Sequence, residues 1–331
     1  MISTDPMEGK ILSILREKGD FVSGQALCGQ LGVSRTAVWK AVNRLRARGY
    51  QIDSATNRGY RLVQMPSGLS REGIAPRLPK EARLLFYSET DSTNTRAKAL
   101  AASGAPEGTV LVADCQTGGR GRRGRSFFSP PGTGVYLSVI LRPACAPMEL
   151  MHLTCAAAVA ACDAVEKVTG LRPGIKWTND LVIGKKKLAG ILTELALEAE
   201  SGQVQYAVIG IGVNCCQEQK DFPPELAETA TSLSLALGRE VDRNALAAGL
   251  AEEFLEMGRT LVSQKAEILA RYRADCVTLG QEVCLVSGDS LRHGFALDVD
   301  GEGALTVRLP DGSVENVRSG EVSVRGMYGY V

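Results

Sequence analysis

The sequence predicts an α+β protein of several domains, and three observations support this fold class. The chain has 331 residues, which is long for a single hydrophobic core, so two or three domains are expected. Apolar residues recur at helical spacing near the N-terminus, whereas the C-terminal part alternates in short runs typical of strands. Between these parts, residues 81–272 contain helical and extended patterns in turn, which indicates a mixed central domain.

Composition restricts the class of protein. The chain is 44% hydrophobic and 23% charged, as in ordinary globular proteins. It contains no run of about 18 apolar residues, and its first ten residues are too polar for a secretion signal, so we expect a cytoplasmic protein without a membrane partner. Nine cysteines without Cys-x-x-Cys spacing indicate reduced thiols, and only two histidines disfavour a histidine-built zinc site or a Ser-His-Asp triad.

Positive charge is concentrated at the N-terminus. Residues 1–64 contain 10 Lys and Arg against 5 Asp and Glu, whereas the remainder contains 28 against 32. A basic domain of this kind is typical of nucleic-acid binding. We therefore expect a DNA-binding domain over residues 1–64, followed by a linker rich in proline and glycine over residues 65–80.

Residues 1–64 are predicted to form three helices and a hairpin. Ser23 is a candidate N-cap for the second helix, Gly32 ends it, and Ser34 caps the third. The residues expected to face inward are Ile11, Leu12 and Leu15 in the first helix, Leu27 and Leu31 in the second, and Val38, Ala41, Val42 and Leu45 in the third. This arrangement resembles a helix-turn-helix, whose second helix enters the major groove of DNA.

The outward face of the third helix carries the expected DNA contacts. Residues 50–54 and 59–63 read as two strands forming a wing, from which Arg58 and Arg61 would reach phosphate groups. The predicted DNA-binding residues are Ser34, Arg35, Thr36, Trp39, Lys40, Asn43 and Arg58. The alternative is a helical cap with a solvated basic face, and the agreement of turn, cap, wing and charge favours DNA binding.

A polar segment begins the central domain. Residues 84–88 read as a strand, and the residues after it lead through Ser92, Thr93 and Asn94 into a helix. A plain N-cap would explain one of these polar side chains but would not require all of them. The segment is therefore a candidate ligand contact.

A glycine-rich segment follows the next strand, which is expected over residues 110–114. Gly119, Gly121 and Gly124 match the dinucleotide pattern G-x-G-x-x-G, but that fingerprint requires a helix immediately afterwards. Ser129-Pro130-Pro131-Gly132 and an extended run follow instead, so a Rossmann site is excluded. The Walker pattern is absent as well.

The same segment contains four arginines. Arg120, Arg122, Arg123 and Arg125 make a cationic loop suited to closing over a phosphate or an acyl phosphate. A solvated basic loop or a nucleic-acid contact would have the same composition. The loop by itself does not separate these alternatives.

Three further segments complete the central pattern. Residues 156–168 are expected to form an alanine-rich helix packed on a sheet. Residues 175–181 and 185–192 pass from a strand end through polar residues and three lysines. Residues 205–209 read as a strand entering Gly210-Ile211-Gly212-Val213-Asn214, whose small residues allow close approach of the backbone to a ligand.

Taken in order, these segments resemble biotin-protein ligases. The motifs are Ser92-Thr93-Asn94, the Gly-Arg loop, Lys176-Trp177-Thr178-Asn179-Asp180, Lys187-Leu188-Ala189-Gly190-Ile191-Leu192 and the segment from Gly210 to Asn214. With the N-terminal domain, the whole chain is similar to the family of bifunctional biotin ligases and biotin operon repressors. The resemblance implies a class II synthetase-like mixed sheet over residues 81–272 and an SH3-like β-barrel over residues 273–331.

The resemblance implies a two-step reaction and its regulation. ATP, with Mg2+, would convert biotin to biotinyl-5′-AMP, and a lysine of a biotin carboxyl carrier protein would then displace AMP. The adenylate would also be the corepressor that favours a homodimer on operator DNA. The expected enzyme is a biotin–[biotin carboxyl-carrier protein] ligase.

The resemblance also implies roles for single residues. The implied biotin contacts are Ser92, Thr93, Asn94, Gln116, Arg120, Gly121, Arg122 and Lys187. The implied nucleotide contacts are Arg120, Arg122, Lys176, Asn179, Asp180, Lys187, Gly210, Gly212 and Asn214. Lys187, Arg122 and Asp180 are expected to be catalytic, with Lys187 stabilising charge beside the biotin carboxylate. Asp180 is expected to serve either magnesium or the incoming lysine.

The sequence departs from the family at two positions, where Thr178 replaces a common proline and Phe127 replaces a common tryptophan. Neither change removes a polar group from the chemistry. Arg318, Gly320 and Glu321 are further candidates to face the active site. Two other functions stay open: a transcription factor that senses biotin without catalysis, and a lipoate or octanoate ligase on the same fold.

Overall fold

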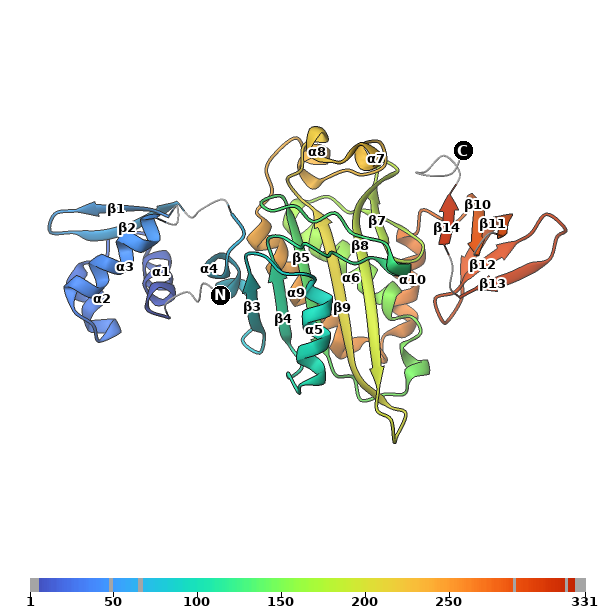
Figure 1. Ribbon diagram of the computed structural model, residues 1–331, viewed down its shortest axis with the longest axis horizontal. Coiled ribbons are helices and arrows are strands. Elements are labelled where there is room, and N and C mark those ends of the chain that lie inside the picture. Colours follow the sequence, from blue (N-terminus) through green and yellow to red (C-terminus); the bar gives the residue numbers. More distant parts are fainter. Residues whose placement is uncertain (1–5, 48–49, 65–67, 288–289, 319–320, 325–331) are drawn as a thin grey trace. The chain divides into compact units, whose positions relative to one another are not determined.

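The computed structural model describes residues 6–47, 50–64, 68–287, 290–318 and 321–324. The chain divides into two compact units, Met1–Arg77 and Leu78–Val331 (Figure 1). The first unit contains α1 (Pro6–Lys18), α2 (Gly24–Leu31), α3 (Arg35–Ala47), β1 (Gln51–Ala55), β2 (Gly59–Gln64), α4 (Arg71–Ile74) and η1 (Ala75–Arg77).

The capping residues of the first unit are where the sequence predicts them. Ser23 Oγ accepts a hydrogen bond from Ala26 N, and Gly32 ends α2 with a left-handed φ of 67°. Ser34 Oγ accepts from the backbone of Ala37 at 3.2 Å, which satisfies one free N–H of α3. The short turn between α2 and α3 is therefore fixed from both sides.

One hydrophobic cluster holds the three helices and the hairpin together. The buried members are Ile11, Leu12, Leu15, Val22, Leu27, Val38, Ala41, Val42, Leu45, Tyr50 and Ile52, and Leu31 packs against them half-buried. β1 and β2 pair antiparallel as the expected wing. The helix-turn-helix with a wing is thereby confirmed.

The second unit is built on a seven-stranded mixed sheet. In spatial order the strands are β3 (Arg83–Tyr87), β4 (Thr109–Ala113), β5 (Gly134–Leu141), β9 (Val204–Asn214), β8 (Lys186–Leu197), β7 (Asp180–Ile183) and β6 (Gly174–Lys176). Only β3 and β4 pair in parallel, and every other neighbouring pair of this sheet is antiparallel. The expected mixed sheet is confirmed.

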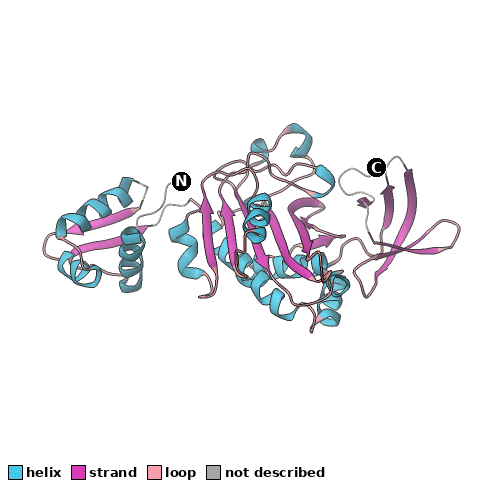
Figure 2. Ribbon diagram, turned by 60° about the horizontal axis from the view of Figure 1, so that its bottom comes forward, coloured by secondary structure: helices cyan, strands magenta, loops and turns pink. Residues whose placement is uncertain are grey.

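Helices cover the two faces of this sheet (Figures 1 and 2). α5 (Thr93–Ala102) packs on one face, where Ala97 and Ala101 join a buried cluster with Ile140 of β5. α6 (Leu153–Thr169) and α9 (Arg243–Thr260) lie on the other face, where Gly258 contacts Leu141, the strand neighbour of Ile140. α10 (Lys265–Asp275) packs on α6.

α6 is the central helix of this unit. The segment 147–169 is long and apolar enough to cross a membrane by length and composition, but 72% of its apolar window is buried inside the structure. Its alanines and Cys155 and Cys162 face the sheet and the neighbouring helices. The nine cysteines all lie in described segments and are free thiols, as expected.

Short elements connect the larger ones, and a small sheet follows α10. The connecting elements are η2 (Arg122–Gly124), η3 (Pro147–Leu150), η4 (Gln219–Asp221), α7 (Pro224–Ala227) and α8 (Leu233–Leu237). The small sheet contains β10 (Glu282–Ser287), β11 (Ser290–Val299), β12 (Leu305–Arg308), β13 (Val314–Val317) and β14 (Glu321–Val324), in the antiparallel order β13-β12-β11-β10-β14.

The turn between β11 and β12 attaches this small sheet to the central domain. Trp177 Nε1 donates a hydrogen bond to Gly303 O at 3.0 Å. Gly303 has a φ of 85°, and a Cβ there would lie 2.9 Å from Cys155 Sγ, so only glycine suits this close contact. The C-terminal β domain is thereby placed against the end of β6.

Candidate active site

Two cavities lie beside β8, and the cationic loop reaches both. The smaller has a volume of about 20 Å³ and is lined by Ser92, Thr93, Asn94, Gln116, Arg120, Phe127, Gly190, Leu192, Gly210, Ile211 and Gly212. The larger, of about 230 Å³, is lined by Arg122, Met151, Thr154, Cys155, Thr178, Ile191, Thr193, Glu302, Gly303, Ala304 and Arg318. Most of the residues expected to bind biotin thus meet at the smaller cavity.

Strand register explains how distant motifs reach the smaller cavity. Across β5, β9 and β8, three rows of paired residues share the face covered by α5. The rows are Tyr136, Gly212 and Gly190; Ser138, Gly210 and Leu192; and Ile140, Val208 and Glu194. The glycines remove side chains from two of these rows, which leaves space above the sheet.

Two side chains use that space. A Cβ on Gly212 would lie 2.4 Å from Phe127 Cε1, and a Cβ on Gly210 would lie 1.8 Å from Asn94 Oδ1. Phe127 also meets Tyr136 edge to face, with the ring centroids 6.4 Å apart. Gly210 and Gly212 therefore face Asn94 and Phe127 in this structure.

A hydrogen-bond network forms the floor of the smaller cavity. Gln116 Oε1 accepts from Thr93 N at 2.8 Å and from Thr93 Oγ1 at 3.2 Å, while Gln116 Nε2 donates to Ser129 Oγ at 3.0 Å. The buried Ser138 Oγ donates to Asn94 Oδ1 at 2.7 Å and lies 2.8 Å from Thr93 Oγ1. Ser92 caps α5 and starts this polar floor.

Glu194 joins the floor to the cationic loop, and the sequence analysis did not identify it. Its Oε2 accepts from Asn94 Nδ2 at 3.1 Å, and its Oε1 lies 2.8 Å from Lys98 Nζ and 3.5 Å from Arg120 Nη1. Burial opposes ionisation of this carboxyl, but the hydrogen bonds from Lys98 and Asn94 and the charges of Lys98 and Arg120 outweigh it, so its pKa is lowered. An acidic residue inside an apolar strand was the signal that could have revealed it.

The cationic loop is fixed at its base by an ion pair. Arg243 of α9 is buried, and its Nη1 lies 2.7 Å from Asp114 Oδ1, directly after β4, and 3.1 Å from Gly134 O. Asp114 Oδ2 also accepts from Gly132 N at 3.1 Å. The two ends of the loop are thus held together by residues that lie 129 positions apart, a relation that no local pattern contains.

Within the loop, the arginines separate. Gly121 N donates to Arg125 O at 2.7 Å, which closes a tight turn around Arg122 and Arg123. Arg120 lines the smaller cavity and Arg122 the larger, where Arg122 Nη1 donates to Asn179 Oδ1 at 2.9 Å. Asn179 Nδ2 in turn donates to Ile191 O.

Lys187 and Asp180 form an ion pair beside the smaller cavity. Lys187 Nζ lies 2.8 Å from Asp180 Oδ1, and their side chains are 33% and 15% exposed. A Cβ on Gly190 would lie 3.4 Å from both Lys187 Nζ and Phe127 Cε2. The amine is therefore next to the smaller cavity and remains reachable by an anionic ligand.

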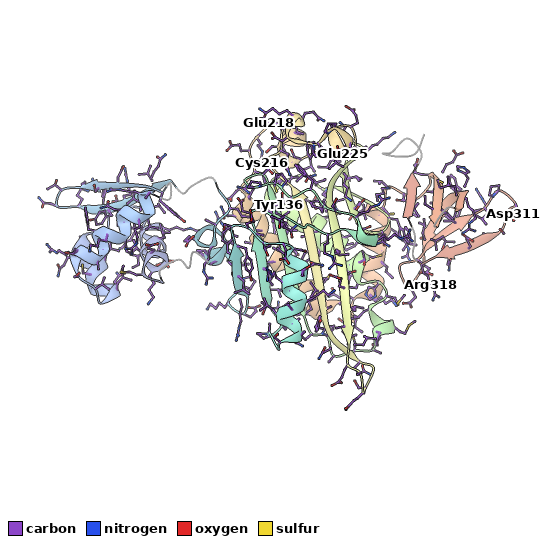
Figure 3. All side chains as sticks on the ribbon, in the orientation of Figure 1. Tyr136, Cys216, Glu218, Glu225, Asp311 and Arg318 are labelled. Atoms are coloured by element: carbon purple, nitrogen blue, oxygen red, sulfur yellow. The ribbon has the colours of Figure 1, made fainter. Side chains whose placement is uncertain are left out.

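Two residues expected to bind nucleotide are buried in this structure. Lys176 is buried in β6 and lines neither cavity. Asn214 is buried at the end of β9, where its Nδ2 donates to Thr231 O at 3.0 Å and its Oδ1 accepts from Gln217 Nε2. Of the C-terminal candidates, Arg318 lines the larger cavity and is labelled in Figure 3 on the side of its sheet facing the central domain, whereas Gly320 and the Glu321 side chain lie outside the described residues.

The expected DNA-binding surface of the first unit is exposed. Arg35, Thr36, Trp39 and Lys40 project from α3, with Trp39 55% exposed, and Ser34 is exposed at its start. Arg35 also donates to Gln25 of α2 at 2.8 Å, and the half-buried Asn43 accepts from Arg46 at 3.5 Å.

The wing arginines are held over an aromatic ring. The guanidinium groups of Arg58 and Arg61 lie 4.4 and 4.8 Å from the centroid of Phe21. Arg58 also pairs with Asp20 and Arg61 with Asp53. Phe21 was not identified from the sequence, and it orients both cations at the wing.

The described segments contain no group of three or more His, Cys, Asp or Glu residues able to hold a metal ion. Asp180 is a single carboxylate beside Lys187. This donor set does not form a metal cage of its own, but it agrees with the usual behaviour of Mg2+, which protein sites bind through one or two carboxylates together with substrate phosphates.

Comparisons with known proteins assign all three parts of the chain. Residues 8–61 match an HTH domain, residues 86–214 match the Biotin/lipoate A/B protein ligase family, and residues 278–325 match the Biotin protein ligase C terminal domain. The chain is 38% identical to "Bifunctional ligase/repressor BirA" of Bacillus subtilis, covering 92% of this chain and 94% of that protein. It is 30% identical to the protein of the same description in Escherichia coli, covering 96% of both chains. The structure of a biotin protein ligase from Aquifex aeolicus in complex with biotin and ATP is similar with a TM-score of 0.62 and 30% identity, over 73% of this chain and 98% of that chain.

Proposed function

The chain belongs to the BirA family of bifunctional ligases and repressors, and from this premise we propose that it attaches biotin to a carrier protein and represses transcription. As a biotin–[biotin carboxyl-carrier protein] ligase, it uses ATP to form biotinyl-5′-AMP and transfers biotin to a lysine of the carrier. The acetyl-CoA carboxylase carrier is the expected acceptor, because a relative 35% identical over 72% of this chain is described as "Biotin--[acetyl-CoA-carboxylase] ligase".

The observation that carries the enzymatic proposal is the position of one loop at two cavities. Arg120 lines the smaller cavity and Arg122 the larger, while Lys187 lies beside Gly190 next to the smaller. A loop of this kind supplies cations to an acid and to a nucleotide at the same time. Such preorganised charges stabilise a developing anion in a site that excludes water.

In the first step, the biotin carboxylate attacks the α-phosphorus of ATP and pyrophosphate leaves. A carboxylate is a poor acceptor for an amine, and the resulting mixed anhydride provides AMP as a good leaving group. Lys187 is positioned to stabilise charge shared between the carboxylate and the α-phosphate, because an ammonium is a compact point charge with three donors. Lys187 must exchange its contact with Asp180 to do so.

In the second step, the carrier lysine attacks the carbonyl carbon, and the bond to AMP breaks. The attacking amine must lose a proton, and the carboxylate of Asp180 is our candidate for receiving or orienting it. Arg122, held by Asn179, stabilises the negative charge that develops on the departing phosphate. The catalytic set is therefore Lys187, Arg122 and Asp180.

The biotin contacts we propose follow the floor of the smaller cavity. Ser92, Thr93 and Gln116 hydrogen-bond the ring system, Asn94 supports them, and the backbone around Gly121 closes over the acid. The nucleotide is assigned to the loop arginines, Lys176, Asn179, Asp180 and Lys187, with Gly210, Gly212 and Asn214 as a wall. Asp180 is the carboxylate that would hold magnesium beside ATP if it does not serve the incoming lysine, and the ion would screen the ATP phosphates.

The repressor function rests on the winged helix-turn-helix. α3 would lie in the major groove, and Arg58 of the wing would contact phosphate. Biotinyl-5′-AMP acts as corepressor by favouring a homodimer, which places two α3 helices on successive turns of operator DNA. The protein acts in the cytoplasm, where carrier and operator are both present.

The domain limits that accompany this proposal are residues 1–64 for DNA binding, 65–80 for the linker, 81–272 for catalysis and 273–331 for the C-terminal SH3-like domain. Close contacts at Gly303 support a role of the last domain in shaping the larger cavity. Its Arg318 would contribute a further cation there.

Incubation of the purified protein with biotin, ATP and a biotin carrier domain tests the enzymatic proposal. Mass spectrometry should detect one added biotinyl group on the carrier, and pyrophosphate should be released even without carrier. Tight biotin binding without either product would favour a sensor that lacks catalysis. Preferential use of lipoate or octanoate would favour the other ligase of this fold.

A further inference from the structure

The loop forms one wall of the smaller cavity in this structure, through Arg120 and Phe127. The cavity volume of about 20 Å³ is the space of about one water molecule, so the loop and the cavity floor lie close together. We call residues 117–128 the flap. The four arginines of the flap repel one another, so an anion from elsewhere in the chain would stabilise its position over the cavity.

Glu194 supplies an anion at this position. Its carboxylate is 19% exposed and contacts Arg120 of the flap at 3.5 Å, Lys98 of α5 at 2.8 Å and Asn94 at 3.1 Å. Strand register places it on the same face of β8 as Gly190 and Leu192, which line the cavity. Burying a carboxylate is unfavourable unless donors surround it, and here three donors do.

Asn94 connects the carboxylate of Glu194 to the floor of the smaller cavity. Its Oδ1 accepts from Ser138, and its Nδ2 donates to Leu192 O and to Glu194. The orientation of the amide is thereby fixed, and Ser138 in turn contacts Thr93 at the cavity floor. One carboxylate therefore contacts both the floor and the flap.

We propose that Glu194 is a positioning residue for acid binding, which holds Arg120 over the smaller cavity and Asn94 in its floor before the acid arrives. This inference rests on the proposed biotin ligase function. The acid then meets a site whose cation and hydrogen-bond donors are already oriented, and it loses less entropy on binding. Glu194 itself does not touch the reacting atoms.

A simpler role for Glu194 would be to attach α5 to the sheet through Lys98. The variants Glu194→Gln and Lys98→Met separate the two roles. Glu194→Gln keeps an oxygen for Asn94 but removes the charge facing Arg120, whereas Lys98→Met removes the helix contact and leaves Glu194 with Arg120. Melting curves of both variants establish that they fold.

The first measurement does not depend on activity. Limited trypsin digestion of the full-length protein without ligand, followed by mass spectrometry of the peptides, reports cleavage after the flap arginines. We expect Glu194→Gln to accelerate this cleavage by about two- to fivefold, the range for a partly exposed ion pair. Lys98→Met should leave it near that of the unsubstituted protein. Equal cleavage in all three proteins, or equal acceleration in both variants, would overturn the proposal.

The second measurement uses the reaction. Glu194→Gln should raise the KM for biotin by about two- to fivefold and change kcat less, and the effect should disappear when Arg120→Gln is already present. An unchanged KM, or an effect that adds fully to that of Arg120→Gln, would refute a role through Arg120. If the unsubstituted protein neither binds nor activates biotin, the proposed function fails, while the flap-cleavage comparison still decides whether Glu194 holds the flap.

Discussion

The ammonium of Lys187 lies 2.8 Å from the carboxylate of Asp180, on two paired strands of the central sheet. Both side chains are partly exposed, and Asp180 pairs with Gly190 across the two strands, so a ligand at Gly190 lies next to this ion pair. The ion pair holds the amine in place while no acid is bound. A ligand carboxylate or phosphate must compete with Asp180 for it.

Replacement of the amine should therefore impair acid activation. For Lys187→Ala we expect the rate of biotin-dependent pyrophosphate release to fall by about 2–4 kcal/mol of transition-state stabilisation, as for other lost donors to a developing anion. Lys185→Ala is the matched control, because Lys185 is exposed in the preceding turn. A Lys187→Ala protein that forms adenylate at a near-normal rate would remove this residue from the catalytic set.

Sequence patterns predicted many of the elements but not the contacts between them. The caps at Ser23 and Ser34, the helix expected over residues 156–168 and the exclusion of a Rossmann sheet depend on local chemistry, and the structure agrees with each. The strand expected over residues 205–209 continues to Asn214. Glycine weakens a strand, but here β5 and β8 pair with Gly210 and Gly212 from both sides.

Other features had no local signal. β13 has only four residues and none of them is buried, so no apolar pattern marks this strand in the sequence. Lys186 and Lys187, the second and third lysines of the 185–187 run, belong to β8, which begins at Lys186. Arg243 and Glu194 act through partners far away in the sequence, so their roles emerge only from the sheet register and the packing of α9.

Contact between Gly212 and Phe127 gives a second prediction. A Cβ on Gly212 would lie 2.4 Å from the ring, so Gly212→Ala must displace Phe127 and with it the flap. We expect the Kd for biotin, measured by calorimetry, to rise at least tenfold. The double variant Gly212→Ala, Phe127→Ala should recover part of this loss because the smaller side chain leaves room for the methyl group.

A matched glycine tests whether the effect is local. Gly301 has no neighbouring atom within 4 Å of its added Cβ, so Gly301→Ala should bind biotin normally. Unaltered biotin binding by Gly212→Ala would mean that the contact between Phe127 and β9 has no part in acid binding.

The third prediction concerns the exposed face of α3. Lys40→Ala should weaken binding to DNA duplexes that the unsubstituted protein enriches from a random pool. Loss of one phosphate contact should also reduce the slope of log K against log salt by about 1. Biotin transfer should be unaffected. Lys18→Ala, which removes the same charge from the end of α1, is the control, and identical salt slopes for all three proteins would exclude Lys40 as a contact.

Buried His152 gives a prediction for pH. Burial is the largest cause of its lowered pKa, with a smaller contribution from Lys265, against the opposing effects of the bond to Leu261 and the charge of Glu302. Its Nε2 donates to Leu261 O at 2.9 Å, and its buried Nδ1 has no hydrogen-bond partner among the described residues, so a second proton on the ring would have no acceptor. Below the ordinary value of 6.5, the unfolded chain binds a proton that the folded chain does not.

The free energy of unfolding of the second unit should therefore fall as the pH decreases from 6.5 toward the lowered pKa of His152. One proton that only the unfolded chain binds changes the free energy of unfolding by at most about 1.4 kcal/mol per pH unit. Urea titrations between pH 5 and 8 measure it, with His152→Gln as the variant that keeps a donor for Leu261 but does not titrate. The stability difference between the two proteins should shrink with decreasing pH, because only the protein with His152 loses stability in this window. A difference that stays constant across the series would show that His152 does not titrate differently in the folded and unfolded chains.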